Sequence, residues 1–337
     1  MRATFSKYTL HFKQPGGTSR GVLYHKDTYF LRLFDEQNPE HYGVGECALF
    51  KGLSREDDGH YEEMLTLLCD NIAKGEPTDL SGHSSIQFGL EAAIMDYTNG
   101  CRRIYFPSPF TQGQTAIPIN GLVWMGKKDK MLARIDQKVQ EGFSTIKLKI
   151  GAIDFDQEFD MVRYVRQKYS DKDLTIRLDA NGGFTPDNAL RRLEALSEYQ
   201  IHSIEQPIKP GQYEQMHTLC TLSPIPIALD EELIGITDPE QMKTLVEKIT
   251  PAYLILKPSL MGGIQGSMEW LRLAQSHNIG AWVTSALESN IGLDFLAQWV
   301  ATLQPRIPQG LGTGGLFTNN IPSPLYLQGE ELHRKSE

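Results

Sequence analysis

The sequence has few cysteines and no long apolar run. Its four cysteines are scattered over 337 residues, and their spacing matches no metal-binding or redox motif. No stretch approaches the roughly 18 uninterrupted apolar residues of a transmembrane helix. The N-terminal MRATFSKYTLHF alternates polar and apolar residues instead of forming the apolar core of a signal peptide. We therefore expect a cytoplasmic protein that has reduced cysteines and makes no contact with a membrane.

Excess positive charge is also absent. The 33 lysines and arginines against 42 aspartates and glutamates give a net charge of −9, and there is no long basic run. Nucleic acid is therefore not an expected partner, whereas a small molecule is. The chain is long enough for one large domain or two unequal ones, and nothing in it specifies an oligomeric state.

The first hundred residues predict a separate α+β unit. Short alternating runs separated by turn residues predict an antiparallel meander up to about residue 50: TLHFK, VLYHK, TYFLRLF and YGVGECALF. Two helical patterns follow, EDDGHYEEMLTLLCDNI and SSIQFGLEAAIMDYTNG. Strands followed by helices are typical of an α+β unit, which we place at residues 1–105.

From about residue 116 the pattern changes to alternating strands and helices. Seven short apolar runs and a weaker eighth can be recognised: AIPINGLVW, TIKLKI, LTIRLDA, IHSIEQP, IPIALDE, AYLILKP, GAWVTS and RIPQGLG. Helix starts are predicted at Thr185-Pro186 and, from capping-box spacing, at Thr237 and Glu240. The fold class predicted for residues 106–314 is therefore α/β, a (β/α)7-8 TIM-like barrel. A doubly wound sheet is disfavoured because no G-x-G-x-x-G follows the first strand.

Five of these strands end in an ionisable residue. They are Lys149, Asp179, Glu205, Asp230 and Lys257, at successive intervals of 30, 26, 25 and 27 residues, close to the length of one βα unit. Because the carboxyl ends of barrel strands meet at one rim, we expect these side chains to lie side by side where barrel enzymes carry their catalytic groups. One such carboxylate could be a loop residue or a helix cap, but three in phase between lysines indicate a site.

The three carboxylates predict a metal site. They would repel one another at one rim unless a cation neutralised them. The ligand set contains only oxygen, which favours a hard cation, and Mg²⁺ is the first choice.

A lysine pair on one strand points to proton chemistry beside that metal. Lys147 and Lys149 are two residues apart and share one strand face, which would also suit an edge strand with one wet face. Inside a barrel, the neighbouring ammonium group and the cation would lower the lysine pKa toward that of a base. Lys257 would face Lys149 across the mouth. Two such lysines suit removal of a proton next to a carboxylate, with the metal holding the resulting enediolate.

The motifs IKLKIG, RLDANGGF, IEQP, ALDEEL and LKPSLMGG resemble those of the enolase superfamily, in its muconate-lactonizing subgroup. Lysine bases combined with Mg²⁺ are a general feature of that superfamily. The resemblance extends to GTSRGVLY, GVGECALFKGLS and FGLEAAIMD in the first hundred residues. It implies that residues 1–105, with the tail 315–337 returning to them, form a capping domain over the barrel mouth. The loops GGTSRG and LFKGLS should then lie nearest the active site.

The resemblance also assigns roles. Asp179, Glu205 and Asp230 would bind Mg²⁺, for which Mn²⁺ could substitute. Lys149 would be the acid/base, Lys257 the opposing lysine, and Lys147 a support for Lys149. Asn181 and Glu231 would lie around this site, although both equally suit residues that fix βα turns.

The residues that follow the last strand narrow the choice of substrate. Dipeptide epimerases of this subgroup carry Asp-x-Asp there to hold an ammonium group, but this chain reads PQGLGTGGLFTNN and has no carboxylate. A substrate with carboxylates and apolar ring atoms is therefore expected. TSRGVL, SALESNIGL and GLGTGGLFTNN most resemble the o-succinylbenzoate synthases. These lyases dehydrate 2-succinyl-6-hydroxy-2,4-cyclohexadiene-1-carboxylate through an enediolate, as a step toward menaquinone.

The expected substrate contacts are Asn181, Gly262, Gly263 and Ser285. The glycines equally suit a turn of the chain, and Ser285 equally suits a helix cap. The leading alternative activity is N-succinylamino acid racemisation, by itself or beside dehydration. A dipeptide epimerase and a non-catalytic barrel that binds an acidic metabolite through its metal are weaker alternatives.

Overall fold

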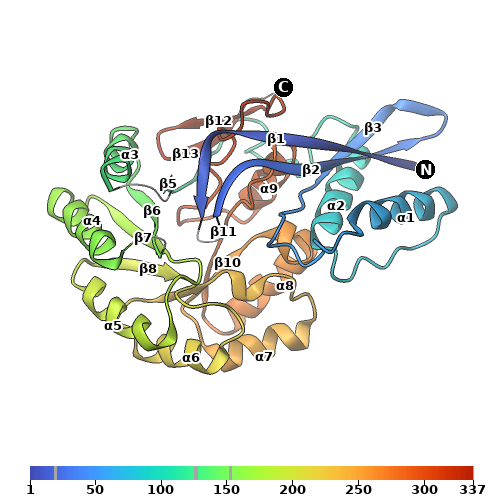
Figure 1. Ribbon diagram of the computed structural model, residues 1–337. Coiled ribbons are helices and arrows are strands. Elements are labelled where there is room, and N and C mark those ends of the chain that lie inside the picture. Colours follow the sequence, from blue (N-terminus) through green and yellow to red (C-terminus); the bar gives the residue numbers. More distant parts are fainter. Residues whose placement is uncertain (19–20, 125–127, 152–153, 337) are drawn as a thin grey trace.

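The computed structural model describes residues 1–18, 21–124, 128–151 and 154–336 and places an antiparallel sheet beside a curved parallel one (Figure 1). The antiparallel sheet has the order β1 (Arg2–Thr18), β2 (Gly21–Asp35) and β3 (Asn38–Cys47). Helices α1 (Tyr61–Lys74) and α2 (Ser84–Thr98) pack on it, and these five elements are called the N-terminal unit below. The predicted meander followed by two helices is confirmed.

Two glycines allow α2 to approach β3 closely. A Cβ atom built at Gly45 would lie 1.8 Å from the carbonyl oxygen of Gly89, and one at Gly89 would lie 2.4 Å from Cys47 Sγ. No larger side chain fits at either position unless the helix moves. The N-terminal unit is thus held together by backbone contact as well as by its apolar core.

The parallel sheet forms the barrel. Its seven strands follow one another in sequence order: β5 (Gly121–Val123), β6 (Thr145–Lys149), β7 (Thr175–Asp179), β8 (Ile201–Glu205), β9 (Ile227–Leu229), β10 (Tyr253–Leu256) and β11 (Gly280–Val283). The weak eighth run contributes two single bridges, from Gln309 to Ile119 and from Gly310 to Thr284. These bridges join the two ends of the sheet, so the predicted TIM-like barrel with an α+β unit is confirmed.

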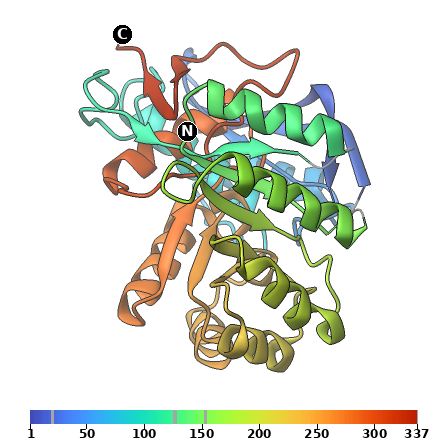
Figure 2. The same cartoon turned by 90° about the vertical axis from the view of Figure 1, so that its left-hand side faces the viewer.

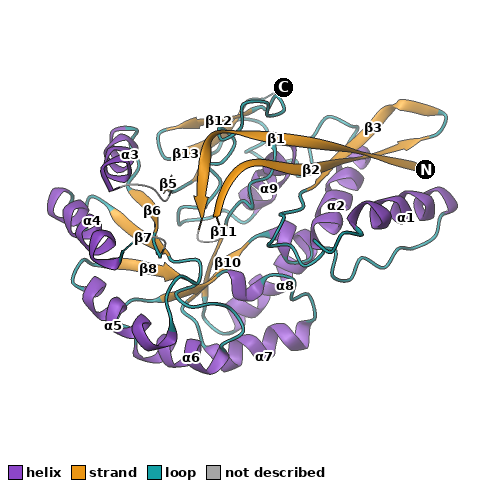
Figure 3. Ribbon diagram, viewed as in Figure 1, coloured by secondary structure: helices purple, strands orange, loops and turns teal. Residues whose placement is uncertain are grey.

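The helices of the barrel lie on the outer side of the strands (Figures 1 to 3). They are α3 (Lys128–Gln140), α4 (Phe155–Lys168), α5 (Pro186–Ser197), α6 (Tyr213–Leu222), α7 (Pro239–Ile249), α8 (Gly263–Ser276) and α9 (Asn290–Thr302). The predicted cap at Thr185 is confirmed and forms a capping box with Asn188. The predicted cap at Thr237 is wrong. Asp238 caps α7 because it directly precedes the first-turn proline, and its side chain accepts a hydrogen bond from Gln241 N at 2.9 Å.

Below the rim, a second layer of side chains fills the barrel. Alternate residues of a strand face the same side, so residues two before the rim positions also point inward. Among them, the Arg177 guanidinium lies 4.1 Å from the centre of the Trp282 ring. His202 reaches the same layer because it is the extra residue of a bulge between β7 and β8, and its ring stacks on Tyr253.

The C-terminal segment contacts both parts of the structure. Residues 316–319 run along β1, where Lys13 N donates to Leu316 O at 2.9 Å and Thr318 N donates to His11 O at 2.8 Å. The chain then forms β12 (Leu325–Gln328) and β13 (Glu331–Arg334), and β13 pairs with β4 (Ile117–Pro118). The division at residues 105 and 315 stays a prediction. Across the described ranges, every helix is too short or too polar to span a membrane.

Candidate active site

The five ionisable residues that the sequence singled out form one row at the rim of the barrel. Lys149, Asp179 and Glu205 are the last residues of β6, β7 and β8 and lie in register with one another. Asp230 and Lys257 directly follow β9 and β10. Because these strands are neighbours in the sheet, the carboxylates lie between the two lysines.

The three carboxylates form a compact buried cluster. Each offers one oxygen within 4.8 Å of the others, and all three side chains are fully buried. Glu205 Oε1 and Asp230 Oδ1 have no hydrogen-bond partner among the described residues. Buried oxygens without donors are rare in proteins, and an oxygen-only set of this kind suits a hard divalent cation. The cluster therefore fits a metal site of the predicted kind.

Three lysines, two at the rim and one in the layer below it, donate to this cluster. Lys147 Nζ lies 2.8 Å from Asp179 Oδ2 and also donates to Glu205 Oε2. Lys149 Nζ lies 2.6 Å from Asp179 Oδ2, and Lys257 Nζ lies 2.5 Å from Asp230 Oδ2. The ammonium groups thus neutralise part of the negative charge at the rim.

Burial and charge shift the pKa values of these groups in opposite directions. Burial raises the pKa of Glu205 to about 7, and the nearby carboxylates add to the effect while Lys147 opposes it. Burial also acts to raise the pKa of Asp179, but Lys147 and Lys149 hold it well below its usual range. For Lys147 and Lys257, burial would lower the pKa, but the carboxylates outweigh it and raise both values.

Asp179 and Glu205 raise the pKa of Lys147 because they stabilise its charged form. This effect follows from the hydrogen bonds that Lys147 makes to both carboxylates. The expectation that a bound cation and the second ammonium group lower the pKa of the lysine pair stays a prediction.

Asn181 connects the acid/base candidate to the cluster. Its Oδ1 accepts from Lys149 Nζ at 2.7 Å, its backbone N–H donates to Asp179 Oδ1 at 3.0 Å, and its Nδ2 donates to Glu231 Oε1 at 2.9 Å. Its φ of 45° places it in the left-handed region that asparagine tolerates in turns. Both roles considered for Asn181, in the site and in the turn, are compatible with these contacts.

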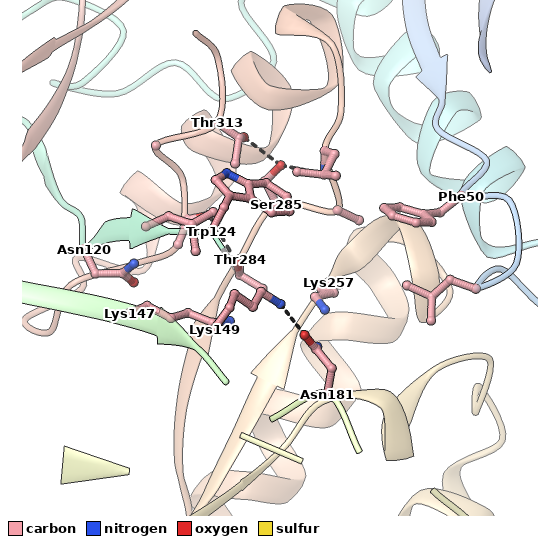
Figure 4. Close-up of a pocket in the computed structure, with 16 residues that line it drawn as sticks. Phe50, Asn120, Trp124, Lys147, Lys149, Asn181, Lys257, Thr284, Ser285 and Thr313 are labelled. Carbon is pink, nitrogen blue, oxygen red and sulfur yellow. Dashed lines mark hydrogen bonds between the residues drawn. The ribbon is translucent and has the colours of Figure 1, made fainter. Parts of the chain in front are cut away.

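A cavity lies above the rim (Figure 4). Lys147, Lys149 and Lys257 lie on its strand side. The rest of its lining comprises Phe50, Leu53, Asn120, Leu122, Trp124, Asn181, Thr284, Ser285, Ala286, Leu287, Gly310, Gly312 and Thr313. Among these described residues the only charged groups are ammonium groups, so the cavity suits an anionic ligand with an apolar body.

The loop LFKGLS reaches this cavity as predicted. Phe50 and Leu53 line it, so the N-terminal unit supplies part of the wall. The other predicted loop, GGTSRG, is described only in part, because Ser19 and Arg20 lie outside the described residues. In its described part, a Cβ atom at Gly16 would lie 3.4 Å from the ring of Trp124, another residue of the wall.

Ser285 lines the cavity, but its hydroxyl group is already fully used. It donates to Glu288 Oε2 at 2.6 Å and accepts from Leu287 N at 3.0 Å and from Thr313 Oγ1 at 2.9 Å. A hydroxyl has one proton to donate and two lone pairs, so none is left to donate to a substrate. Ser285 does not cap the following helix either, because Ser289 is the N-cap residue of α9. Ser285 therefore shapes the wall through its position.

Gly262 and Gly263 lie at the start of α8, with φ values of 85° and 72°. A Cβ at Gly262 would lie 2.9 Å from Thr237 Cγ2, and one at Gly263 would lie 2.5 Å from Glu91 Oε2. The Glu91 carboxylate of α2 accepts hydrogen bonds from the next two backbone N–H groups, Ile264 and Gln265. These contacts favour the role of the two glycines in turning the chain over the role in substrate binding.

Several wall residues were not singled out from the sequence. Asn120 directly precedes β5 and Trp124 directly follows it, and this first barrel strand carries no ionisable residue and therefore gave no signal. Thr313 lies in GLGTGG, a segment that was informative only through its lack of carboxylates. The signal that could have found Thr313 is its hydroxyl group close to the end of the last strand.

Comparisons with known proteins agree on one family. Residues 130–315 match the enolase C-terminal domain-like family. The o-succinylbenzoate synthase of Desulfotalea psychrophila is 43% identical to this chain over 98% of both chains. The crystal structure of MenC from the same organism superposes with a TM-score of 0.88, at 40% identity over 99% of both chains.

A more distant structure shows the same fold. A dipeptide epimerase from Enterococcus faecalis, complexed with Mg and the dipeptide L-Leu-L-Tyr, superposes with a TM-score of 0.81 at 19% identity. The alignment covers 99% of this chain and 97% of that one.

Proposed function

Because this chain belongs to the enolase C-terminal domain-like family, we propose that it is an o-succinylbenzoate synthase. It would dehydrate 2-succinyl-6-hydroxy-2,4-cyclohexadiene-1-carboxylate to o-succinylbenzoate, in menaquinone biosynthesis. The observation that carries this choice is a cavity whose charged lining groups are three lysines, directly above a cluster of three carboxylates. The full-length relative in Desulfotalea psychrophila bears the same name.

The lining of the cavity matches the chemistry of this substrate. The substrate carries two carboxylates, one on the ring and one on the succinyl tail, together with a ketone, a hydroxyl group and apolar ring and chain carbons. The ammonium group of Lys257 would attract the ring carboxylate to the rim. Phe50, Leu53 and Trp124 would pack on the ring and the tail. A dipeptide would instead need an anion for its ammonium group, and no described residue in this lining is acidic.

Lys149 is the acid/base in this proposal. In its neutral form it would take the proton from the ring carbon that bears the carboxylate, and the electron pair left behind moves into that carboxylate group as an enediolate. The enediolate then expels the hydroxyl group of the neighbouring carbon as the same lysine returns a proton to it, so water leaves and the ring becomes aromatic. Asn181 Oδ1 would orient Lys149 during both transfers, because it already accepts from Nζ.

Lys257 has a different task. It approaches from the other end of the row, so its ammonium group would stabilise negative charge on the reacting carboxylate without touching the proton that is removed. Lys147 lies two residues before Lys149 on the same strand face and would hold Asp179 and Glu205 in place.

Asp179, Glu205 and Asp230 would hold Mg²⁺, and Mn²⁺ is expected to substitute for it. The cation would supply positive charge to these carboxylates and to the substrate carboxylate. We further propose that residues 1–105 and 315–337 act as the capping domain. The four free cysteines suit a cytoplasmic location.

One assay tests the proposed function. The purified protein with Mg²⁺ is given the cyclohexadiene carboxylate and, separately, N-succinyl amino acids and dipeptides. We expect o-succinylbenzoate to form faster than any amino acid derivative is racemised. Efficient racemisation without o-succinylbenzoate would identify an N-succinylamino acid racemase instead.

A further inference from the structure

A buried lysine of the N-terminal unit lies at the junction with the barrel. Lys26 in β2 is only 7% exposed, and its Nζ has no hydrogen-bond partner among the described residues. Burial lowers the pKa of Lys26, while the negative charges of Glu46, Glu288 and Asp27 act on it in the opposite direction. A buried ammonium group is retained where carboxylates balance its charge.

Glu46 joins the N-terminal unit to the first turn of α9. Its carboxylate accepts from Thr28 Oγ1 at 2.7 Å within the unit. Across the junction it accepts from Ser289 N at 2.9 Å, Ser289 Oγ at 2.5 Å and Gly292 N at 2.9 Å. An anion is favoured at this position because the N-terminus of a helix presents free N–H groups and a partial positive charge.

Glu288 joins two rim loops of the barrel. It is fully buried, and its two oxygens accept from Ser259 Oγ and Ser285 Oγ, both at 2.6 Å. Ser259 lies two residues after Lys257, and Ser285 lines the cavity. The carboxylate of Glu288 therefore fixes the distance between the loop after β10 and the cavity wall after β11.

Glu46 and Glu288 both lie against Gly292. A Cβ atom at Gly292 would lie 2.8 Å from Glu46 Oε2 and 2.9 Å from Glu288 Cβ. Lys26 lies two residues before Thr28 on the same face of β2, and Thr28 donates to Glu46, so the buried lysine lies on the side of the strand that meets α9. Two carboxylates buried in one region repel unless a cation balances them, and the charges of Glu46 and Glu288 both act on Lys26.

We propose that Lys26 is a positioning residue for the substrate cavity: its ammonium group balances the buried carboxylates of Glu46 and Glu288, and Glu288 in turn fixes Ser285 in the cavity wall. The wall after β11 then takes its correct shape only when the N-terminal unit is seated on the barrel. The link to catalysis rests on the proposed function, whereas the link between the charges does not.

The first test separates binding from chemistry. Lys26→Met keeps the length of the side chain and removes its charge, and Lys26→Arg keeps the charge. With the cyclohexadiene carboxylate as substrate, we expect KM to rise about tenfold in Lys26→Met while kcat stays within about threefold, because the rim lysines are on other elements. Lys26→Arg should stay within about threefold of wild type in KM. Equal damage from both variants would show that the charge is not what matters.

The second test uses stability and no substrate. Unfolding by denaturant is compared for wild type, Lys26→Met, Glu288→Gln and the double variant, in a double-mutant cycle. Charge balance predicts that Lys26→Met is far less harmful when Glu288 is already neutral, so the double variant unfolds at a higher denaturant concentration than Lys26→Met. If Lys26→Met does not fold, the double variant should still fold. Additive effects, or a double variant that also fails to fold, would overturn the proposal whatever the substrate proves to be.

Discussion

Glu91 in α2 accepts a hydrogen bond from the backbone N–H of Ile264, in the first turn of α8, at 2.6 Å. The other oxygen of Glu91 accepts from Gln265 N at 3.2 Å. A side chain of the N-terminal unit thus caps a helix of the barrel whose own N-cap residue, Gly262, has no side chain to do so. The same two hydrogen bonds therefore cap α8 and join the N-terminal unit to the barrel.

Replacing Glu91 by Gln should therefore weaken this junction. One of the two N–H groups of α8 would face an amide NH₂ instead of an oxygen, and the loss of such a cap typically lowers the free energy of unfolding by about 1 kcal/mol. Denaturant unfolding measures the change. Glu240→Gln, in the exposed first turn of α7, is the matched control and should have little effect. A Glu91→Gln protein as stable as this control would contradict the prediction.

Metal removal should abolish activity. A chelator leaves three buried carboxylates without their cation, and addition of Mg²⁺ or Mn²⁺ should restore turnover of the cyclohexadiene carboxylate. Full activity in protein shown by elemental analysis to be metal-free would exclude a metal-dependent mechanism.

Glu205→Gln should weaken metal binding without unfolding the barrel. It removes one ligand charge and keeps the size of the side chain. Calorimetric titration with Mg²⁺ should show an affinity at least tenfold lower than in wild type. Glu232→Gln is the control, because this neighbouring carboxylate lies outside the cluster and accepts from Gly211 N and Gln206 Nε2. Equal losses in the two variants would count against the assigned ligand set.

The two rim lysines should respond differently to substitution. Lys149→Ala should stop both dehydration and exchange of the substrate α-proton with solvent, because no other residue is assigned to move that proton. Lys257→Arg keeps a cation that does not readily release a proton, so it should retain measurable dehydration. Any racemase activity of the wild type should be lost in Lys257→Arg, since racemisation needs a proton donor on each face. Proton exchange that persists in Lys149→Ala would assign the base to another residue.

The free energy of unfolding should decrease as the pH is lowered, in part because of His202. Burial, together with the charge of Arg177, lowers the pKa of His202 to about 4. The unfolded chain, with a histidine pKa of about 6.5, binds the proton first as the pH is lowered. The stability that His202 contributes is therefore complete above about pH 6.5 and is lost on going down to about pH 4, by roughly 2–3 kcal/mol at most. Denaturant unfolding at pH 7 and pH 4.5 should show a smaller decrease in His202→Gln than in wild type.

The sequence predicted the residues at the rim of the barrel more completely than the residues in the cavity walls. Lys149, Asp179 and Glu205 could be found because each ends a strand, and the strands repeat with the length of a βα unit. The barrel followed from the same repetition, since strand and helix patterns depend mainly on local spacing. The closing bridges at Gln309 and Gly310 were only weakly indicated, because two isolated residues leave almost no periodic pattern.

The cavity walls depend on contacts between distant segments, which spacing does not reveal. Phe50 lines the same cavity as Lys149 only because the N-terminal unit is seated on the barrel. The hydroxyl group of Ser285 looked available in the sequence, and its use by Glu288, Leu287 and Thr313 became visible only in three dimensions. In the same way, the sequence left open whether Gly263 binds the substrate or turns the chain, and it gave no sign that Glu91 lies opposite this glycine.

All five rim residues come from one uninterrupted stretch of the chain, residues 149–257, whereas the apolar walls come from segments before and after it. The residues proposed for proton transfer and those proposed for substrate recognition are thus encoded in separate parts of the gene. If the proposed function is correct, mutations in the flanking segments should change which carboxylate fits while the residues proposed to transfer protons stay as they are. An engineer who wants a new substrate for this scaffold should therefore diversify residues 50–53, 120–124 and 284–313 and leave the middle of the chain untouched.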